Sequence, residues 1–576
     1  MTARFSSSIA AALITLFAAA VFAETPPGRE EFKRSFHKAL PLTSGQKFRI
    51  EHSNGEIRVR THREARAVID AAIRVSSSDE EGAERFSREI EIQVEQTAQG
   101  ISVRTRYPEK KWSLLGRGHI SYSVDYDILV PETAPLEARN RFGSVAVSGL
   151  KAPADIKNSN GSIAFRDGRG AQRLENSFGS IELTGNVGDA ALENSNGSIT
   201  VSQLQGALEA RNRFGTVTAT RVAGQSTIVN SNGGVHLEES GGAADVSNSF
   251  GSVSVRNLDG ALTVQNSNGS VEVAGIAGDA ELATSFGGIQ FSDMKKRVSC
   301  TGSNARISGG KVAETVTVRN TFGAVEIKDA GGVEIENSNG KITVRDIRGG
   351  ALLTTSFGAI DAAGIGGNAT VVNSNSWITL LNVAGDAEVR NRFGKVHVTR
   401  VQGSAKVSSD NGTVTVADVK GPAFVKTSFG LLEAARIDGD LTAENSNGGV
   451  RALFIKGAVD IRTSFGPVTV QAAGGSVEVT NQNGSIEVSH LPAAEKECRR
   501  IALKTSFAPI RLALPEGADY NVSARTSFGK IVTEVPMNVS GSLSSESLSG
   551  KIGDGRCELT LTNSNGNIEL RRGEAK

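Results

Sequence analysis

Residues 194–199 read NSNGSI, and residues 212–217 read NRFGTV. The two frames share Asn at the first place and Gly at the fourth place, but the third place changes from Asn to Phe. Twenty such frames begin between residues 140 and 481, and Asn and Phe alternate at the third place. Eighteen of the nineteen intervals between them are eighteen residues long, and one is seventeen. A step this regular predicts a repeat protein in which each repeat is one structural unit.

Each repeat is expected to contain two short extended segments that meet at the corner Gly. Side chains alternate between the two sides of an extended chain, so one set of residues should face inward. Gly fits the corner because it accepts a positive φ without a Cβ clash, and a second turn follows near a Gly such as Gly206. In the repeat around NSNGSI, the predicted inward set is Leu192, Asn194, Asn196, Ile199 and Val201.

Two all-β architectures can use such repeats. Asn-Gly between extended runs is typical of a two-residue β-hairpin, but half of the corners are Phe-Gly, which does not favour that turn. We therefore favour a parallel β-solenoid, in which each coil hydrogen-bonds to the coil below it at a spacing of ~4.8 Å. One repeat of about eighteen residues per coil is expected, and a coil made of two repeats is the alternative.

The alternation of Asn and Phe suggests a packing role for the third place. With one repeat per coil, inward Phe rings would recur every ~9.6 Å, with Asn between them. Bulky rings that interleave with smaller side chains would fill the corner without overpacking. Phe214 would then be buried, and Phe214→Ala should cost ~3–5 kcal/mol of stability. Duplication of a pair of repeats would also leave the alternation behind, whatever its packing value.

The first residues have the pattern of a secretory signal peptide. Arg4 precedes an apolar stretch from Ile9 to Phe22, and the residues up to Ala23 offer a cleavage site before Glu24. The apolar stretch is shorter than the ~20 residues that a spanning helix needs, so cleavage is favoured over a transmembrane anchor. We expect a signal peptide at 1–23 and an exported chain, periplasmic or at the cell surface, without a stable transmembrane anchor.

The remainder of the chain is expected to have three segments. An open solenoid end exposes a strand edge, so a cap is expected at each end. The segments are an N-terminal β-rich cap at 24–137, regular β-solenoid repeats at 138–490, and irregular C-terminal coils with a cap at 491–576. Within the N-terminal cap we predict an isolated coil at 52–60, one short helix from about Ser78, and strands at 90–96, 101–108 and 119–131.

Charge and cysteine content bear on the class of partner. The formal net charge is +1 and no long run has one sign, so a nucleic-acid partner is not expected. The spacings of Cys300, Cys498 and Cys557 match no metal-binding pattern. Cys498 and Cys557 could pair in an oxidising compartment, and buried or idle thiols are the alternative.

The order of these features resembles a bacterial family named "putative adhesin", a domain of unknown function made of β-strand repeats. The resemblance lies in the isolated SNGEI coil, the helix-containing excursion, a strand ending at Val130-Pro131, and the repeated N-G-x-I and F-G-x-V units. It covers most of the chain that follows the signal peptide. The resemblance implies an exported, right-handed β-solenoid, and it assigns no functional residues.

No catalytic, cofactor-binding or metal-binding residue is predicted. Catalysis needs different groups that converge on one face, and the outward places after the corner Gly show no acidic or basic cluster that repeats in adjacent coils. His236 and His397 are interpreted as solvated surface residues, and the calcium repeat G-G-x-G-x-D is absent. Trp377 points outward by parity, so it is a candidate for a sugar or partner contact.

These observations favour an exported, non-enzymatic structural or adhesive scaffold of the cell envelope. An envelope polysaccharide or protein is the expected class of partner. One alternative is a carbohydrate-binding or carbohydrate-processing β-helix protein, which a face lined by acids or aromatics would support. A second alternative is a self-assembling subunit that polymerises through uncapped ends.

Overall fold

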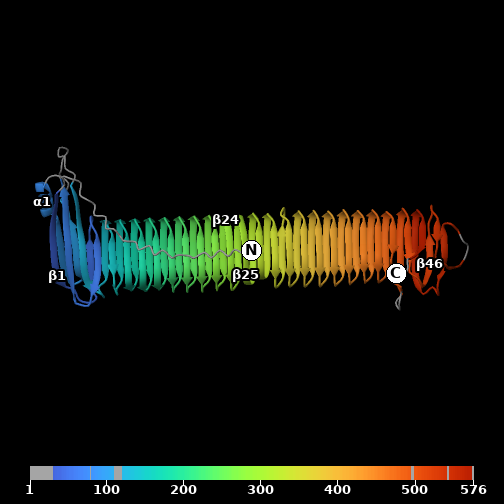
Figure 1. Ribbon diagram of the computed structural model, residues 1–576, viewed down its shortest axis with the longest axis horizontal. Helices are drawn as coiled ribbons and strands as arrows, with labels where there is room; N and C mark the ends of the chain where they lie inside the picture. Colours follow the sequence, from blue (N-terminus) through green and yellow to red (C-terminus); the bar gives the residue numbers. More distant parts are fainter. Residues whose placement is uncertain (1–29, 78–79, 109–119, 494–497, 541–543, 574–576) are drawn as a thin grey trace, which may run out of the picture. The chain divides into compact units, whose positions relative to one another are not determined.

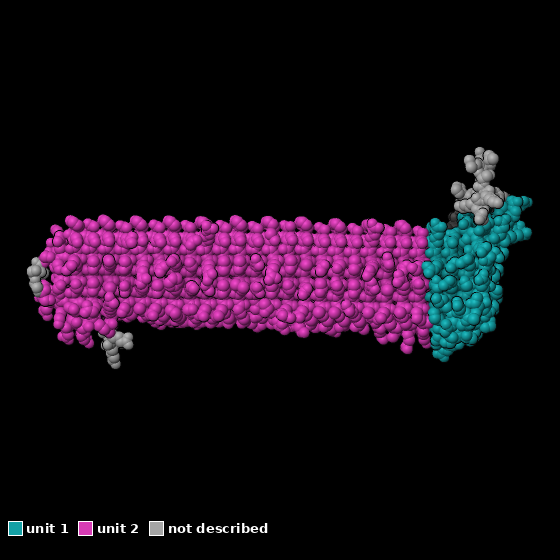
Figure 2. All heavy atoms as spheres, turned by 180° about the vertical axis from the view of Figure 1, so that it is seen from behind, with its two compact units in different colours: residues 1–145 teal, residues 146–576 magenta. Residues whose placement is uncertain are grey.

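The computed structural model describes residues 30–77, 80–108, 120–493, 498–540 and 544–573. The chain divides into two compact units, unit 1 at residues 1–145 and unit 2 at residues 146–576 (Figure 2). The predicted signal peptide at 1–23 lies outside the described residues.

Unit 2 is a parallel β-solenoid in which each repeat forms one coil. β14 (Ala190–Asn196) pairs in parallel with β16 (Leu208–Phe214), and the paired residues are eighteen positions apart. β15 (Ile199–Gln205) pairs in the same way with β17 (Val217–Val222). The strands therefore stack in register along one axis (Figure 1). The structure confirms the all-β solenoid and one repeat per coil, while the right-handedness implied by the family resemblance stays a prediction.

The two strands of each coil continue as two columns through unit 2. The first column also contains β10 (Ala154–Asn160), β12 (Gln172–Phe178), β18 (Ser226–Asn232), β20 (Ala244–Phe250), β22 (Leu262–Asn268), β28 (Ala351–Thr355), β30 (Ala369–Asn375), β32 (Ala387–Phe393), β34 (Ala405–Asn411), β36 (Ala423–Phe429), β38 (Leu441–Asn447), β40 (Val459–Phe465), β42 (Val477–Asn483) and β44 (Ile501–Phe507). The second column also contains β11 (Ile163–Arg169), β13 (Ile181–Val187), β19 (Val235–Ser240), β21 (Val253–Leu258), β23 (Val271–Ile276), β27 (Ile342–Ile347), β29 (Ile360–Ile365), β31 (Ile378–Val383), β33 (Val396–Val401), β35 (Val414–Val419), β37 (Leu432–Ile437), β39 (Val450–Ile455), β41 (Val468–Ala473), β43 (Ile486–Ser489) and β45 (Ile510–Leu514). Three long strands run through a turn and serve both columns: β24 (Ala280–Met294), β25 (Val298–Phe322) and β26 (Val325–Asn339).

The corner Gly is required by both the backbone and the neighbouring coil. Gly215 has a φ of +119°, in the region that side chains rarely adopt. A Cβ atom at Gly215 would lie 2.3 Å from the carbonyl oxygen of Gly197 in the preceding coil. Any larger residue would therefore force the two coils apart at this corner.

The core of unit 2 consists of columns of Ile, Val, Leu and Ala side chains between the two strand columns. Ile199 and Val201 are fully buried, as predicted. At one level the neighbouring coil leaves room for a large ring: Phe291 is buried beside Gly309. A Cβ atom at Gly309 would lie 2.1 Å from the Phe291 ring, so this pair is a large residue matched to the smallest one.

Unit 1 is made of two series of strands and one helix. In the first series β1 (Glu30–Pro41), β4 (Arg66–Ser77) and β7 (Ser121–Pro131) are antiparallel neighbours, and β3 (Ile57–His62) pairs in parallel with β7. The second series runs β5 (Glu91–Thr97), β6 (Gly100–Arg106), β2 (Lys47–Glu51) and β8 (Leu136–Phe142). The helix α1 (Glu80–Glu89) contacts β1 and β4, and β9 (Val145–Ser148) crosses the boundary between the units.

The predicted helix and the three predicted strands of this region are present in unit 1. The long strands β1 and β4 are not predicted by the sequence pattern. Within the described residues, no helix is long and apolar enough to cross a membrane.

The C-terminal end of unit 2 departs from simple stacking. β50 (Cys557–Asn565) lies between β44 and β46 (Tyr520–Arg525). The last repeat of the sequence is therefore stacked between two strands that come earlier in the chain. β51 (Ile568–Arg572) likewise lies between β45 and β47 (Ile531–Thr533). Beyond β46 come antiparallel β49 (Ser547–Ile552) and the two-residue β48 (Asn538–Val539). A short, antiparallel outer edge protects a sheet from pairing with other chains.

Candidate functional site

The Phe residues at the third place of the frames are exposed, so the prediction that they face inward is wrong. Between 44% and 64% of each of these residues is accessible to solvent. We call them the Phe column: Phe178, Phe214, Phe250, Phe286, Phe322, Phe357, Phe393, Phe429, Phe465 and Phe507. Phe142, which ends β8 in unit 1, and Phe528 are also exposed.

The error arises because the alternation of side chains becomes irregular just before the corner Gly. In β14 the inward set is correct for Leu192 and Asn194, which are buried, but Asn196 is only half-buried. Strict alternation holds only while the chain stays straight. The pairing of β14 with β16 runs to Asn196 but skips Ser195, so the alternation is irregular just before the corner, and a Phe at the third place is exposed to solvent.

Asn residues occupy the third place in the coils between the rings. Asn196 lies directly between Phe178 and Phe214 in the strand pairing. Its Nδ2 donates a hydrogen bond to the backbone oxygen of Ser177, at 3.2 Å, in the preceding coil. Asn232 does the same to the backbone oxygen of Arg213, at 3.3 Å. These short side chains bind back onto the corner and leave a gap between successive rings.

The Phe column is flanked mainly by small uncharged residues. The second place of the frame is usually Ser, and the fifth place is often Ser, Thr, Gly or Ala. Charged residues also occur at these places, namely Arg213, Arg306, Lys341, Arg392, Lys395 and Asp410. The guanidinium of Arg213 lies 5.4 Å from the Phe214 ring centroid, and that of Arg392 lies 5.5 Å from the Phe393 ring centroid. Side chains of unit 2 align in straight rows along its long axis (Figure 2), as expected for coils stacked in register.

The first-place Asn residues have a structural role, which agrees with the inward direction predicted for Asn194. Asn212 is buried, and its Nδ2 donates to the backbone oxygen of Gly197 at 3.1 Å. Where Thr replaces Asn, the hydroxyl makes the equivalent bond, as Thr284 does to the backbone oxygen of Gly269 at 3.3 Å. This column therefore ties each coil to the corner of the preceding coil.

The turn on the opposite side of each coil carries a second repeated feature. In most coils one residue there has a positive φ without being Gly, as at Arg400, Asp418, Arg436 and Phe454, with φ between 54° and 59°; in others, such as at Gly185, the residue is Gly. Side chains at this place form ion pairs between coils: Arg436 Nε lies 2.5 Å from Asp418 Oδ1. Hydrogen bonding from Arg436 holds the pKa of Asp418 below its usual range. The chain does bend at Gly206, as predicted, but the residue with positive φ three places before it, Gln203 in that coil, was not predicted from the sequence.

A groove of about 1260 Å³ follows this turn near the C-terminal end of unit 2. Its lining includes the half-exposed Phe454 and the buried Leu491, together with charged residues. Lys420 and Lys456 both pair with Asp438, at 2.9 and 2.8 Å, and these two lysines lower the pKa of Asp438. Two lysines therefore share one carboxylate in this part of the groove.

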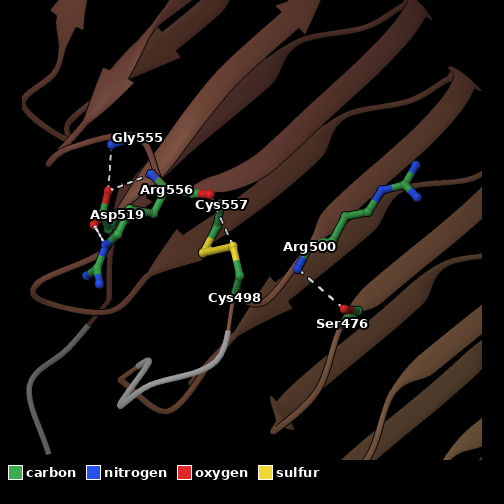
Figure 3. The surroundings of a disulfide bond; sticks show 7 residues. All are labelled: Ser476, Cys498, Arg500, Asp519, Gly555, Arg556 and Cys557. Carbon is green, nitrogen blue, oxygen red and sulfur yellow. Dashed lines mark hydrogen bonds and ion pairs between the residues drawn. A yellow bond between two sulfur atoms is a disulfide. The ribbon is translucent and has the colours of Figure 1, made fainter.

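Cys498 and Cys557 form a disulfide, with their Cα atoms 5.2 Å apart (Figure 3). The loop before Cys557 is held by Asp519, whose carboxylate accepts backbone N–H bonds from Gly555 at 2.6 Å and Arg556 at 3.0 Å. Backbone and side-chain bonds from Arg556 lower the pKa of Asp519. Cys300 is a buried free thiol, and burial raises its pKa.

Unit 1 contains a buried polar cluster that the sequence analysis did not identify. His52 Nδ1 lies 3.0 Å from Thr105 Oγ1, which lies 2.6 Å from the hydroxyl of Tyr126. Burial lowers the pKa of His52 to about 4 and raises the pKa of Tyr126 to about 12. His52 is therefore neutral at physiological pH.

The other residues considered from the sequence do not converge on one place. His236 and His397 are exposed, as predicted. Trp377 is 42% exposed, and the Lys341 ammonium lies 5.6 Å from its ring centroid. Among the described residues, no group of three or more His, Cys, Asp and Glu side chains is arranged to hold a metal ion.

Comparison with known proteins identifies the repeats. Residues 304–571 match the family described as Toastrack DUF4097. This match confirms the resemblance to a repeat-based domain of unknown function over that part of the chain. One solved structure that matches is "Crystal structure of a putative cell adhesion protein from Clostridium sporogenes ATCC 15579 at 1.95 A resolution", at 11% identity and a TM-score of 0.15. The match covers 37% of this chain and 100% of that one. No curated protein matches the chain.

Proposed function

We propose that this protein is an exported, non-enzymatic scaffold of the cell envelope that binds its partner through the Phe column. The β-solenoid supplies a long and regular frame, and the Phe column supplies the surface that is available for contact. The observation that carries the proposal is the exposure of ten rings at one constant interval on one corner of unit 2.

Exposed aromatic residues in such a series call for a functional explanation. Single exposed apolar residues are common on soluble proteins, but contiguous apolar patches larger than a few hundred Å² usually mark interaction sites. Each corner would also fold with Asn at the third place, because the intervening coils do so. The exposed rings are therefore unnecessary for building the coil and are best explained by binding.

Repetition of one side chain favours binding over catalysis. A catalytic site needs a few different groups, an acid or base and a partner, positioned around one reacting atom. The Phe column instead presents the same apolar group many times along a line. Such a surface suits many weak contacts made together, in which the combined affinity greatly exceeds that of one contact.

Export is supported by two features at opposite ends of the chain. The residues at 1–23 have the apolar pattern of a signal peptide. The Cys498–Cys557 disulfide is a bond that persists in oxidising compartments such as the periplasm or the cell exterior. Fractionation of the native host, with an alkylation assay of the cysteines, tests this part; a cytoplasmic, fully reduced chain would contradict it.

The binding part can be tested with two matched double variants of the purified chain. Phe429→Asn with Phe465→Asn removes two rings of the column, using the residue that neighbouring coils carry at the same place. Phe424→Asn with Phe454→Asn removes two exposed Phe residues that lie outside the column. We expect weaker binding to isolated envelope preparations for the first variant alone. Equal binding by both variants would reject the Phe column as the surface that contacts envelope material.

A further inference from the structure

We propose that the partner of the Phe column is a second copy of the chain. Two units 2 would lie side by side and antiparallel, with the rings of one copy between the rings of the other. This inference rests on the proposed function of the column as a binding surface and names the partner for it. Four properties of the column support it: its pitch, its gaps, its symmetry and its area.

The pitch of the column is the first argument. Rings occur on every second coil, so successive rings are ~9.6 Å apart, and ten rings extend over on the order of 90 Å. A partner that contacts all of them must carry matching features at the same interval over the whole length. A second copy satisfies this condition by construction, because the same strand spacing sets its pitch.

The gaps between the rings have the size that a ring from another copy requires. The intervening Asn196 and Asn232 bind back onto backbone oxygens and leave the space between rings open. A ring inserted halfway would lie ~4.8 Å along the axis from the ring on either side. Aromatic pairs prefer centroid distances of about 4.5–7 Å, so each inserted ring would contact two others.

Symmetry then selects the antiparallel arrangement. A closed dimer has a two-fold axis, and the same patch faces itself on both copies. If the two-fold axis were parallel to the long axis of the solenoid, each Phe would face a Phe at the same level and the rings would collide. If the two-fold axis is perpendicular to the long axis of the solenoid, the two copies run in opposite directions. A shift of one coil then places every Phe of one copy opposite an Asn of the other.

The area of the column is sufficient for a stable dimer. A Phe side chain buries about 150–250 Å² when fully covered, so a half-exposed ring offers roughly 100 Å². Ten such rings offer on the order of 1,000 Å² per copy, against ~800 Å² per partner in a typical stable interface. The small Ser, Thr, Gly and Ala residues beside the rings allow close approach, and depletion of charge is typical of interface centres.

Sedimentation equilibrium of the purified full chain tests the proposal. We expect a monomer–dimer equilibrium between about 0.1 and about 100 µM. Replacement of four central rings, Phe286, Phe322, Phe357 and Phe393, by Asn should raise the dissociation constant at least ~100-fold, because buried aromatic anchors dominate interface energy. The control Phe424→Asn with Phe454→Asn should leave the constant unchanged. A wild-type chain that stays monomeric up to about 100 µM would overturn the proposal.

Two further measurements test the fold of the four-ring variant and the relative direction of the two copies. Circular dichroism and thermal unfolding should show that the four-ring variant keeps its fold; if it does not, Phe322→Asn with Phe357→Asn replaces it. A flexible bis-maleimide should join a Ser177→Cys chain to a Ser464→Cys chain, since these residues flank rings near opposite ends of the column. Efficient joining of two Ser177→Cys chains instead would overturn the antiparallel arrangement.

The outcome separates this inference from the proposed function. A monomeric chain that still needs the Phe column to bind an envelope polysaccharide or protein overturns the second copy as partner and leaves the binding surface standing. A chain that neither dimerises nor needs the column to bind envelope material overturns both.

Discussion

At the scale of single residues, the corner of each coil separates structural from functional positions. The first place is usually Asn or Thr and the fourth place is usually Gly, and both serve to build the corner, whereas the third place accepts Asn and Phe in alternate coils. Asn212 and Phe214 are only two positions apart in one frame, but they differ in role. Substitution of Phe214 should change stability little, whereas substitution of Asn212 should lower it.

Replacement of Phe214 by Asn should change stability by less than about 1 kcal/mol, because the ring is 44% exposed and its burial adds little to the fold. Thermal unfolding and hydrogen exchange of the adjacent strands would measure the change. A loss of about 3–5 kcal/mol, as expected for a buried ring, would show that the ring packs inside the coil after all.

Replacement of Asn212 should have the larger effect. Asn212→Ala removes the hydrogen bond to the backbone oxygen of Gly197 and leaves that oxygen buried without this donor, which should cost about 1–3 kcal/mol. Asn212→Thr is the matched control, since Thr284 makes the equivalent bond with its hydroxyl. Hydrogen exchange at β14 and β16 reports the local loss. Equal protection in both variants would mean that the side-chain bond contributes nothing.

Residue patterns predict the corner well but not the side on which each residue lies. The period, the corner Gly and the buried Asn194 all follow from spacing and alternation. The direction of Phe214 does not, because it depends on an irregularity in the strand pairing just before the corner. The equal acceptance of Asn and Phe at one place was the available signal, since a buried site rarely accepts both without a change in its neighbours.

At the scale of elements, the non-repeating parts were hardest to predict. β1 and β4 do not belong to the eighteen-residue repeat, and their antiparallel pairing brings together residues from 25 (Pro41 and Arg66) to 47 (Glu30 and Ser77) positions apart. The insertion of β50 between β44 and β46 likewise depends on long-range pairing. Local pattern cannot specify which strand becomes the neighbour of which, whereas a repeat specifies its own neighbour.

The stability of unit 1 should fall in mild acid. His52 has a pKa of about 4 in the fold and about 6.5 when unfolded, so between these values the unfolded state binds the proton more tightly. The contribution is fully present above pH 6.5 and is lost as the pH falls towards 4, by up to about 3 kcal/mol. Hydrogen exchange of β3 and β7 at pH 7 and pH 5 measures it. His52→Gln should remove this part of the pH dependence; an unchanged slope would exclude His52 as its source.

The disulfide should stabilise the inserted C-terminal coil. It joins residues 59 positions apart, and the chain-entropy estimate for a loop of this length is about 4 kcal/mol. Cys498→Ser, or reduction of the native chain, should increase proteolysis and hydrogen exchange in β46 and β50. Cys300→Ser is the control for loss of a thiol outside the bond. Equal protection with and without the disulfide would show that the strand pairing alone holds this end.

At the scale of unit 2, a regular interior produces a regular exterior. Because every coil lies in register on the one before it, any residue type favoured at one frame position becomes a straight column on the surface. The Phe column therefore needs no dedicated domain; it arises from one substitution repeated every second coil. Its length, rather than the strength of any one contact, would set the affinity.

Hydroxyl-radical footprinting of the wild-type chain, read by mass spectrometry at each Phe, tests the central claim most directly. In dilute solution the ten rings of the Phe column should be oxidised readily, while the buried Phe165 and Phe291 stay protected. As the chain concentration rises through the dimer range, the column should become protected and the off-column Phe454 should not. Protection of the column at every concentration would contradict its exposure, and oxidation that never changes would contradict association through it.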